Sequence, residues 1–81
     1  MVNISETIEL VVAEDKKVLT FNYLPQTDRT IYDICDMQGR ILVTCPIIEN
    51  TTNVDLSNFI SGQYILLILD GDKVCSKKFK V

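Results

Sequence analysis

The sequence has no histidine and no tryptophan among its 81 residues, and its cysteines are odd in number, three. Without histidine the chain cannot build a Ser/His or Cys/His nucleophile pair. Without tryptophan it has few rings for an exposed sugar-binding platform, and among its tyrosines Tyr32 is the best candidate for such a ring. The composition therefore disfavours an enzyme or a sugar-binding protein, and we expect no cofactor.

Long apolar runs and a basic stripe are also missing. The longest apolar run, Ile65–Leu69, is far below the ~18 residues that a membrane-spanning helix needs. The net charge is −3, and the one basic cluster, Lys77, Lys78 and Lys80, is too local for a nucleic-acid interface. Residues Met1–Glu6 lack the basic and apolar regions of a signal peptide. We therefore expect a cytosolic protein, a mature exported protein or the tail of a longer precursor.

The three cysteines are not spaced as a zinc or redox motif, because none belongs to a CxxC pair. A two-residue hairpin loop at Gln38-Gly39 would place Cys35 opposite Leu42. Cys45 would then lie about 10 Å further along the ribbon, at ~3.3 Å per residue. This separation exceeds the ~7 Å Cα limit of a disulfide. We expect Cys35, Cys45 and Cys75 to be free thiols.

Apolar and polar residues alternate with a period of two along most of the chain. Leu19, Phe21 and Tyr23 share one parity, for example, and would face a core. Residues 55–62 are compatible with one helical turn, with Ser57 as its cap and Gly62 as a left-handed stop. Seven strands at spacings of about 8–12 residues predict an all-β, antiparallel, immunoglobulin-like sandwich without a long helix, forming a single domain over residues 1–81. The expected strands cover residues 8–12, 18–23, 31–36, 40–45, 53–56, 65–69 and 74–81.

The carboxylates do not suggest a reactive site. Asp33 and Asp36 would point to opposite faces of one strand. Asp70 and Asp72 flank a turn glycine, where the backbone alone favours aspartate. A calcium site would need more oxygen ligands at closer spacing. We predict no catalytic residue and no metal site.

The last strand is the candidate recognition site. Its lysines could discourage pairing with other sheet edges, which is a common property of terminal strands. They could instead belong to a strand that a receptor reads through backbone and side chains, with Phe79 as the buried anchor in both cases. The run Ile65–Leu69, in the strand expected to precede this one, is apolar on both faces. It therefore predicts a strand whose two faces are both covered, either within the core or with a partner on one face. The candidate recognition residues are Lys77, Lys78, Phe79, Lys80 and Val81.

Segments within residues 30–81 resemble a known family. Ile34–Leu42 is similar to its central hairpin, with the pattern v-x-D-x-x-G-r-v. Val54–Ser57 and Ser61–Leu66 are similar to its segment i-d-L-S-x-L-x-x-G-x-Y-x-l. Asp70–Val74 and Lys77–Phe79 are similar to its closing hairpin, g-x-k-v-x-x-k-k-f. Together these segments resemble the C-terminal sorting domain of type IX secretion substrates, with Asp36, Gly39, Asp55, Leu56, Gly62 and Tyr64 as the structural motif residues.

The resemblance implies a small β-sandwich at the end of an exported cargo protein. Outer-membrane export machinery would recognise it, and it is often removed or exchanged for a surface lipid anchor. It implies a non-enzymatic function, a protein partner and a location in the cell envelope, periplasmic or exported. The late motif also resembles small stand-alone periplasmic β-sandwich proteins of unknown function. Such a protein would be a structural or interaction module, with sheet edges that could pair as a homo-oligomer, and a cytoplasmic location stays a further alternative.

Overall fold

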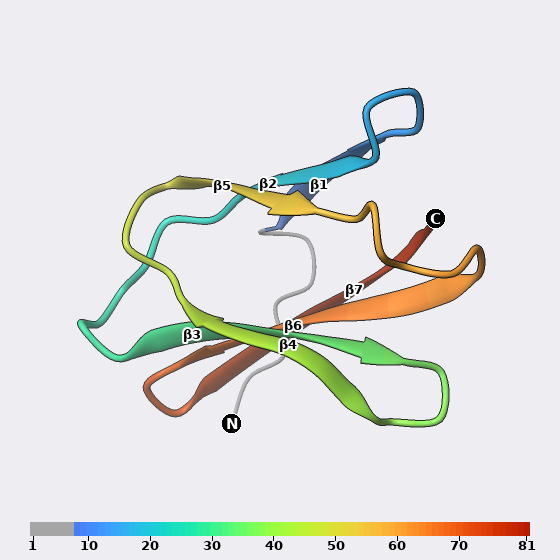
Figure 1. Ribbon diagram of the computed structural model, residues 1–81. Helices are drawn as coiled ribbons and strands as arrows, with labels where there is room; N and C mark the ends of the chain where they lie inside the picture. Colours follow the sequence, from blue (N-terminus) through green and yellow to red (C-terminus); the bar gives the residue numbers. More distant parts are fainter. Residues whose placement is uncertain (1–7) are drawn as a thin grey trace.

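The computed structural model describes residues 8–81, and in this range it contains seven β-strands and no helix (Figure 1). The strands form two antiparallel sheets that lie as two layers, which confirms the predicted β-sandwich. Among the described residues there is no helix that is long and apolar enough to cross a membrane. The strands are β1 Glu9–Ala13, β2 Val18–Asn22, β3 Thr30–Asp36, β4 Ile41–Pro46, β5 Thr51–Asp55, β6 Gln63–Asp70 and β7 Lys73–Lys80.

The two sheets have unequal sizes. The smaller sheet has the strand order β1-β2-β5, and the larger sheet has the order β4-β3-β6-β7. In an immunoglobulin constant domain the fourth strand joins the sheet of the first, second and fifth strands, whereas here β4 pairs with β3. The larger sheet consequently has β4 at one edge and β7 at the other.

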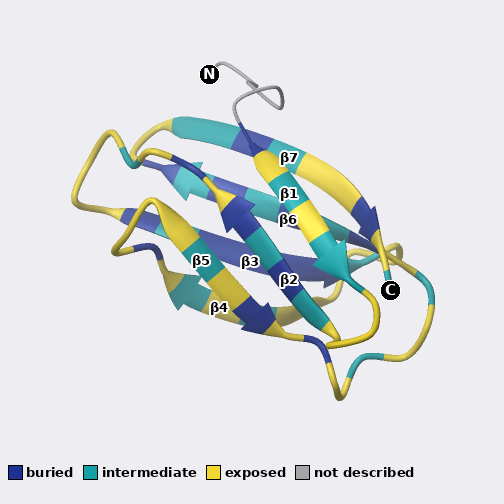
Figure 2. Cartoon of the chain, turned by 90° about the horizontal axis from the view of Figure 1, so that it is seen from above, coloured by how far each residue is buried: buried dark blue, intermediate teal, exposed yellow. Residues whose placement is uncertain are grey.

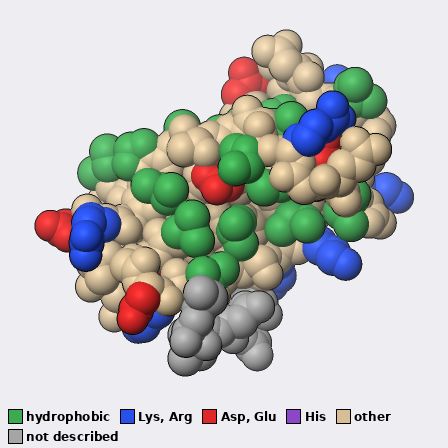
Figure 3. Space-filling model, turned by 90° about the horizontal axis from the view of Figure 1, so that it is seen from below, with side chains coloured by type: hydrophobic (Ala, Val, Ile, Leu, Met, Phe, Trp, Pro, Cys, Tyr) green, Lys and Arg blue, Asp and Glu red, His purple; other side chains and the backbone are tan. Residues whose placement is uncertain are grey.

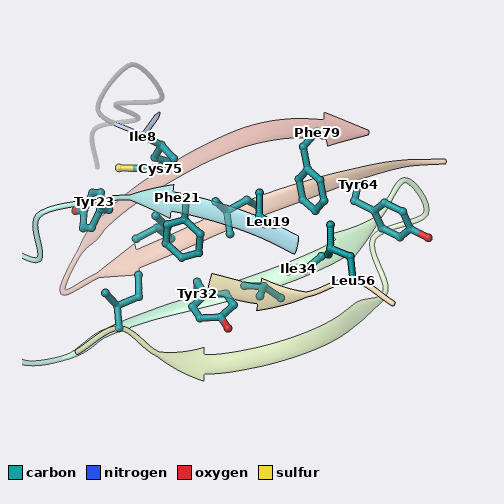
Figure 4. Close-up of a cluster of buried hydrophobic side chains, with 14 residues drawn as sticks. Ile8, Leu19, Phe21, Tyr23, Tyr32, Ile34, Leu56, Tyr64, Cys75 and Phe79 are labelled. Atoms are coloured by element: carbon teal, nitrogen blue, oxygen red, sulfur yellow. The ribbon is translucent and has the colours of Figure 1, made fainter. Parts of the chain in front are cut away.

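The core lies between the two layers, and it is built by the alternation of residues along each strand (Figures 2 and 4). Leu19 and Phe21 of β2 face Tyr32 and Ile34 of β3, and all four are buried. The Phe21 and Tyr32 rings pack edge to face, with centroids 5.2 Å apart. Tyr32 is therefore a core residue, and the expectation that it forms an exposed ring is wrong. Its burial, followed by a hydrogen bond with Cys45, raises the Tyr32 pKa to about 12.

The β3–β4 hairpin differs from the predicted register. Cys35 lies opposite Ile41 rather than Leu42, because the ladder shifts between Ile34 and Cys35. A bulge of this kind adds one residue to one strand and increases the local twist. The period-two pattern gives no sign of the extra residue. No disulfide bond joins Cys35, Cys45 or Cys75, all of which lie among the described residues.

The segment after β5 is a turn rather than a helical turn. The Ser57 N–H donates to Asp55 Oδ1 at 2.9 Å, so the aspartate and not the serine caps the turn. The Phe59 N–H donates to the Leu56 carbonyl at 2.9 Å. Gly62 has φ of 157°, far from the left-handed helical value near 57° that a helix stop requires. The expected cap and stop are therefore wrong.

Asp70, at the end of β6, is buried and accepts hydrogen bonds from the β2–β3 connection and from β3. The donors are the Tyr23 hydroxyl at 2.7 Å, the Gln26 N–H at 2.7 Å and the Thr27 N–H at 3.0 Å. The hydroxyls of Thr27 and Thr30 also donate, at 2.7 and 2.9 Å. Burial alone would raise the Asp70 pKa, but these hydrogen bonds to the carboxylate outweigh burial and hold its pKa well below the usual value. Asp70 is thus more than the turn residue that the sequence predicted.

Candidate functional site

Four of the predicted recognition residues lie on β7, which is an edge strand of the larger sheet, and Val81 directly follows it (Figure 1). β7 pairs with β6 along its whole length, and no described strand pairs with its other side. Gly62 and Val81 extend the pairing by one step, because each N–H donates to the carbonyl of the other residue, at 3.1 and 2.8 Å. One edge of β7 is therefore paired, and the other edge, which we call the open edge, has no partner strand among residues 8–81.

The pair formed by Gly62 and Val81 determines which backbone groups of β7 face the open edge. Hydrogen-bonded pairs alternate with non-hydrogen-bonded pairs along an antiparallel ladder. The N–H and C=O groups of Phe79 consequently point toward β6, whereas those of Lys78 and Lys80 point away from it. The open edge offers these groups to an added strand.

Lys77, Lys78 and Lys80 of β7 do not form one cluster. Lys77 lies on the same face of the strand as Phe79, and its Nζ donates to the Ile8 carbonyl at 3.1 Å. Lys78 and Lys80 are exposed and lie on the opposite face. The sequence could have shown this separation, because Lys77 is two residues before the buried Phe79 and residues two apart share a face.

Aromatic packing fixes the end of β7. Phe79 is only 6% exposed, and its ring stacks on Tyr64 with centroids 5.8 Å apart and an interplanar angle of 26° (Figure 4). Tyr64 also packs edge to face on Phe59, at 5.2 Å. The Tyr64 hydroxyl donates to the Ile60 carbonyl at 2.5 Å. Phe79, the predicted anchor of the last strand, and Tyr64, a structural motif residue, thus belong to one packed group.

The motif residues of the β3–β4 hairpin build its turn. Asp36 accepts from the N–H groups of Gln38 and Arg40, at 2.9 and 3.0 Å, and from Arg40 Nε at 2.7 Å. These interactions, the backbone bond from Arg40 first, lower the Asp36 pKa. Gly39 has φ of 88°, in a region where side chains cause strain. Both residues therefore have a structural reason to occupy their positions.

The second motif segment lies beside this turn. Leu56 is fully buried, and its N–H donates to the Lys17 carbonyl at 2.8 Å, which ties the end of β5 to the β1–β2 turn. The hydrogen bond from the Ser57 backbone lowers the Asp55 pKa. Both motif segments border an open groove of about 550 Å³ at one end of the sandwich. Its lining residues are Asp36, Arg40, Leu42, Val43, Asp55, Asn58, Phe59, Ile60 and Tyr64.

Among the described residues, the carboxylates and cysteines are the candidates for a metal site or a reactive group. Residues 8–81 contain no group of three or more metal-ligating side chains. Asp33 faces away from the core and accepts a hydrogen bond from the Thr44 hydroxyl at 2.5 Å, whereas Asp36 belongs to the turn described above. Burial, and then the charges of these two carboxylates, raise the Cys35 pKa, which disfavours its reactive thiolate.

Comparison with known protein families gives a match that covers most of the chain. The family model described as secretion system C-terminal sorting domain matches residues 13–81, which include both motif segments and all of β7. The search of curated proteins found no match.

Proposed function

This chain belongs to the secretion system C-terminal sorting domain family, and we propose that Lys77–Val81 is the part that the export machinery reads. The family establishes a sorting signal recognised by type IX secretion machinery, a protein partner in that machinery and export to the cell envelope. The family is not catalytic. We further propose that the chain has no enzymatic activity and that it is periplasmic before export.

The open edge of β7 is the observation that carries this proposal. Lys78 and Lys80 direct their N–H and C=O groups away from β6, so a strand of a receptor could pair with them. Phe79, between them, holds the strand to the core through its contact with Tyr64. A receptor would therefore meet an ordered edge and would not need to order this strand when it binds.

The structural motif residues support this edge from a distance. Gly62 extends the ladder to Val81, and Tyr64 supports the Phe79 ring. Asp36 and Asp55 shape the turns at the same end of the sandwich. In this proposal these residues hold the recognition strand in place and do not themselves contact the receptor.

A proline at position 78 tests the open edge directly. Proline lacks the N–H group, and at Lys78 that group points away from β6, so Lys78→Pro removes an edge donor and leaves the β6–β7 ladder bonds in place. A reporter with a secretory signal peptide would be fused ahead of residues 1–81 and expressed in cells that have type IX machinery. We expect the Lys78→Pro fusion to stay in the periplasm, as measured by fractionation and immunoblotting.

The matched control is Lys78→Ala, which removes the charge and keeps the N–H group. We expect this fusion to be exported with a reduced yield at most, since one exposed charge contributes little. Normal export of a folded Lys78→Pro fusion would contradict recognition through the strand edge. Equal failure of both variants would show that the lysine side chain is read instead.

A further inference from the structure

The outer face of the larger sheet is apolar where an outer face is usually polar. An antiparallel sheet with one solvated face normally alternates apolar and polar residues. On β6 the core side is formed by Leu66 and Ile68, yet the outward positions are Ile65, Leu67 and Leu69, all half-buried. The strand is apolar on both sides, and no described element of the chain covers its outward side.

The register extends this apolar surface across the neighbouring strands. Ile31 and Cys35 of β3 pair with Leu69 and Ile65, and Val74 of β7 pairs with Leu69. Figure 3, which views the molecule from the side of this sheet, shows hydrophobic side chains distributed over the face. We call this surface the outer face; its apolar members are Ile31, Cys35, Ile41, Pro46, Ile65, Leu67, Leu69 and Val74.

The outward positions of the smaller sheet are different. Only Val11, Ala13 and Val18 are apolar there, and Val11 is a single valine 68% exposed at the edge strand. The other outward positions are polar: Glu9, Thr20, Asn22, Thr51, Asn53 and Asp55. The two faces of one small protein therefore differ in kind, and an apolar sheet face of this extent indicates a surface that becomes covered.

We propose that the outer face is a docking surface for a protein partner that presents an apolar patch bordered by carboxylates. This inference rests on the proposed function, because it enlarges the recognition site from the edge of β7 to the face that adjoins it. Lys78 and Lys80 are the exposed charges at the outward positions of the four strands. Asp33 is the one outward carboxylate, but it is buried and bound to Thr44. Acidic groups on the partner would complement this pair of lysines.

Two other occupants fit the face less well. A second copy packed by the same face would bring lysines and no exposed carboxylate to the lysines of the first. A membrane surface would favour protruding aromatic or apolar side chains within a broad basic area. Here Ile65, Leu67 and Leu69 are half-buried, no aromatic residue lies at the outward positions, and only two lysines adjoin the apolar residues. A sheet face suits packing against another protein element, at about 10 Å between layers.

The first test replaces apolar side chains of the outer face by threonine, which retains a strong preference for strands. The variant Ile65→Thr/Leu69→Thr would be compared with Val11→Thr/Val18→Thr, which makes the same kind of change on the other sheet. The readout is reporter export by the full chain in cells with type IX machinery. We expect at least about a tenfold loss of export for the first variant, equivalent to 1.4 kcal/mol of lost binding, and none for the control.

A second variant guards against loss of folding. Ser76→Arg adds a bulky side chain at the half-buried outward position opposite Leu67, and it removes no apolar packing. Its control is Thr20→Arg, at an outward position of the smaller sheet. Circular dichroism melting would verify that both purified proteins are folded. We expect Ser76→Arg to block export and Thr20→Arg to leave it unchanged.

The outcomes separate this inference from the proposed function. Normal export of folded Ser76→Arg, together with failure of Lys78→Pro, would overturn the docking face and leave edge recognition intact. Failure of Ser76→Arg with normal export of Lys78→Pro would support the face and overturn recognition through the edge. Binding of the purified chain to vesicles of phosphatidylglycerol and phosphatidylethanolamine would overturn the proposed protein partner of the outer face in favour of a membrane surface. Sedimentation equilibrium could instead show a dimer that the Ser76→Arg substitution dissociates. That result would overturn the proposed partner in favour of a second copy of this chain.

Discussion

At the scale of single residues, Asp70 joins parts of the fold that are distant in the sequence. Tyr23 is 47 residues away and Gln26 is 44 residues away, and both donate to the same carboxylate oxygen. Burial, followed by the bond to Asp70, raises the Tyr23 pKa. Asp70 is 1% exposed, so its negative charge is tolerated only because several donors surround it. This residue therefore holds the β2–β3 connection against the end of β6.

Replacement of Asp70 by asparagine tests this function. The variant Asp70→Asn keeps the shape, but in either orientation its amide NH2 group replaces an oxygen that accepts from a backbone N–H, that of Gln26 or that of Thr27, and this N–H can only donate. We expect it to lower the free energy of unfolding by about 3 kcal/mol at pH 7. Urea unfolding followed by circular dichroism would measure the loss. The matched control is Asp72→Asn, in the same turn but exposed, for which we expect a change within about 0.5 kcal/mol.

The same residue predicts a dependence on pH. The Asp70 pKa is lower in the folded chain than the unfolded value of about 3.9, so the ionised form stabilises the fold. Its contribution is complete above the unfolded pKa and is lost as the pH falls toward the folded pKa. We expect the stability of the unmodified chain to decrease more steeply than that of Asp70→Asn below about pH 4. Parallel curves for the two proteins would contradict this assignment.

At the scale of elements, β7 is held by its ladder to β6 and by the Phe79 ring. The variant Phe79→Ala should cost about 3–5 kcal/mol of unfolding free energy, because it removes a buried ring and leaves a cavity beside Tyr64. Chemical denaturation would measure this cost. Lys80→Ala, at an exposed neighbouring position, provides the comparison and should be nearly silent. A loss below about 1 kcal/mol for Phe79→Ala would remove Phe79 as the anchor.

The strands were predictable mainly from alternation along the chain, which is clearest in β2, where Leu19 and Phe21 are buried and their neighbours are not. The bulge at Leu42 was not, because Ile41, Leu42 and Val43 are all apolar and so hide the one-residue shift of the alternation that a bulge causes. The expected helical turn after β5 failed for a different reason. Ser57 and Asp55 are both good capping residues, and which of them accepts the bond depends on the backbone path.

The candidate site was less predictable than the strands. The sequence located the basic residues of β7, but it grouped Lys77 with Lys78, and the structure places them on opposite faces. The contact between Phe79 and Tyr64 depends on the pairing of two strands, which no local pattern specifies. Asp70 was read as a turn residue because its donors are more than 40 positions away in the sequence or in the neighbouring strand.

At the scale of the whole molecule, the features that suit recognition lie on one side. The open edge of β7 and the apolar outer face adjoin each other, and both belong to the larger sheet. The smaller sheet presents mainly polar residues and closes the core (Figure 2). A receptor that meets the larger sheet could therefore read an edge and a face together, while the smaller sheet supplies the packing that keeps both in shape.

The most direct test of the central claim is whether this chain alone directs a protein out of the cell. A reporter with a secretory signal peptide, with and without residues 1–81 fused to its end, would be expressed in cells with type IX machinery and in matched cells without it. We predict reporter at the surface or in the medium only when both chain and machinery are present, and its retention when residues 77–81 are deleted. Retention of the intact fusion in the periplasm of competent cells would contradict the account.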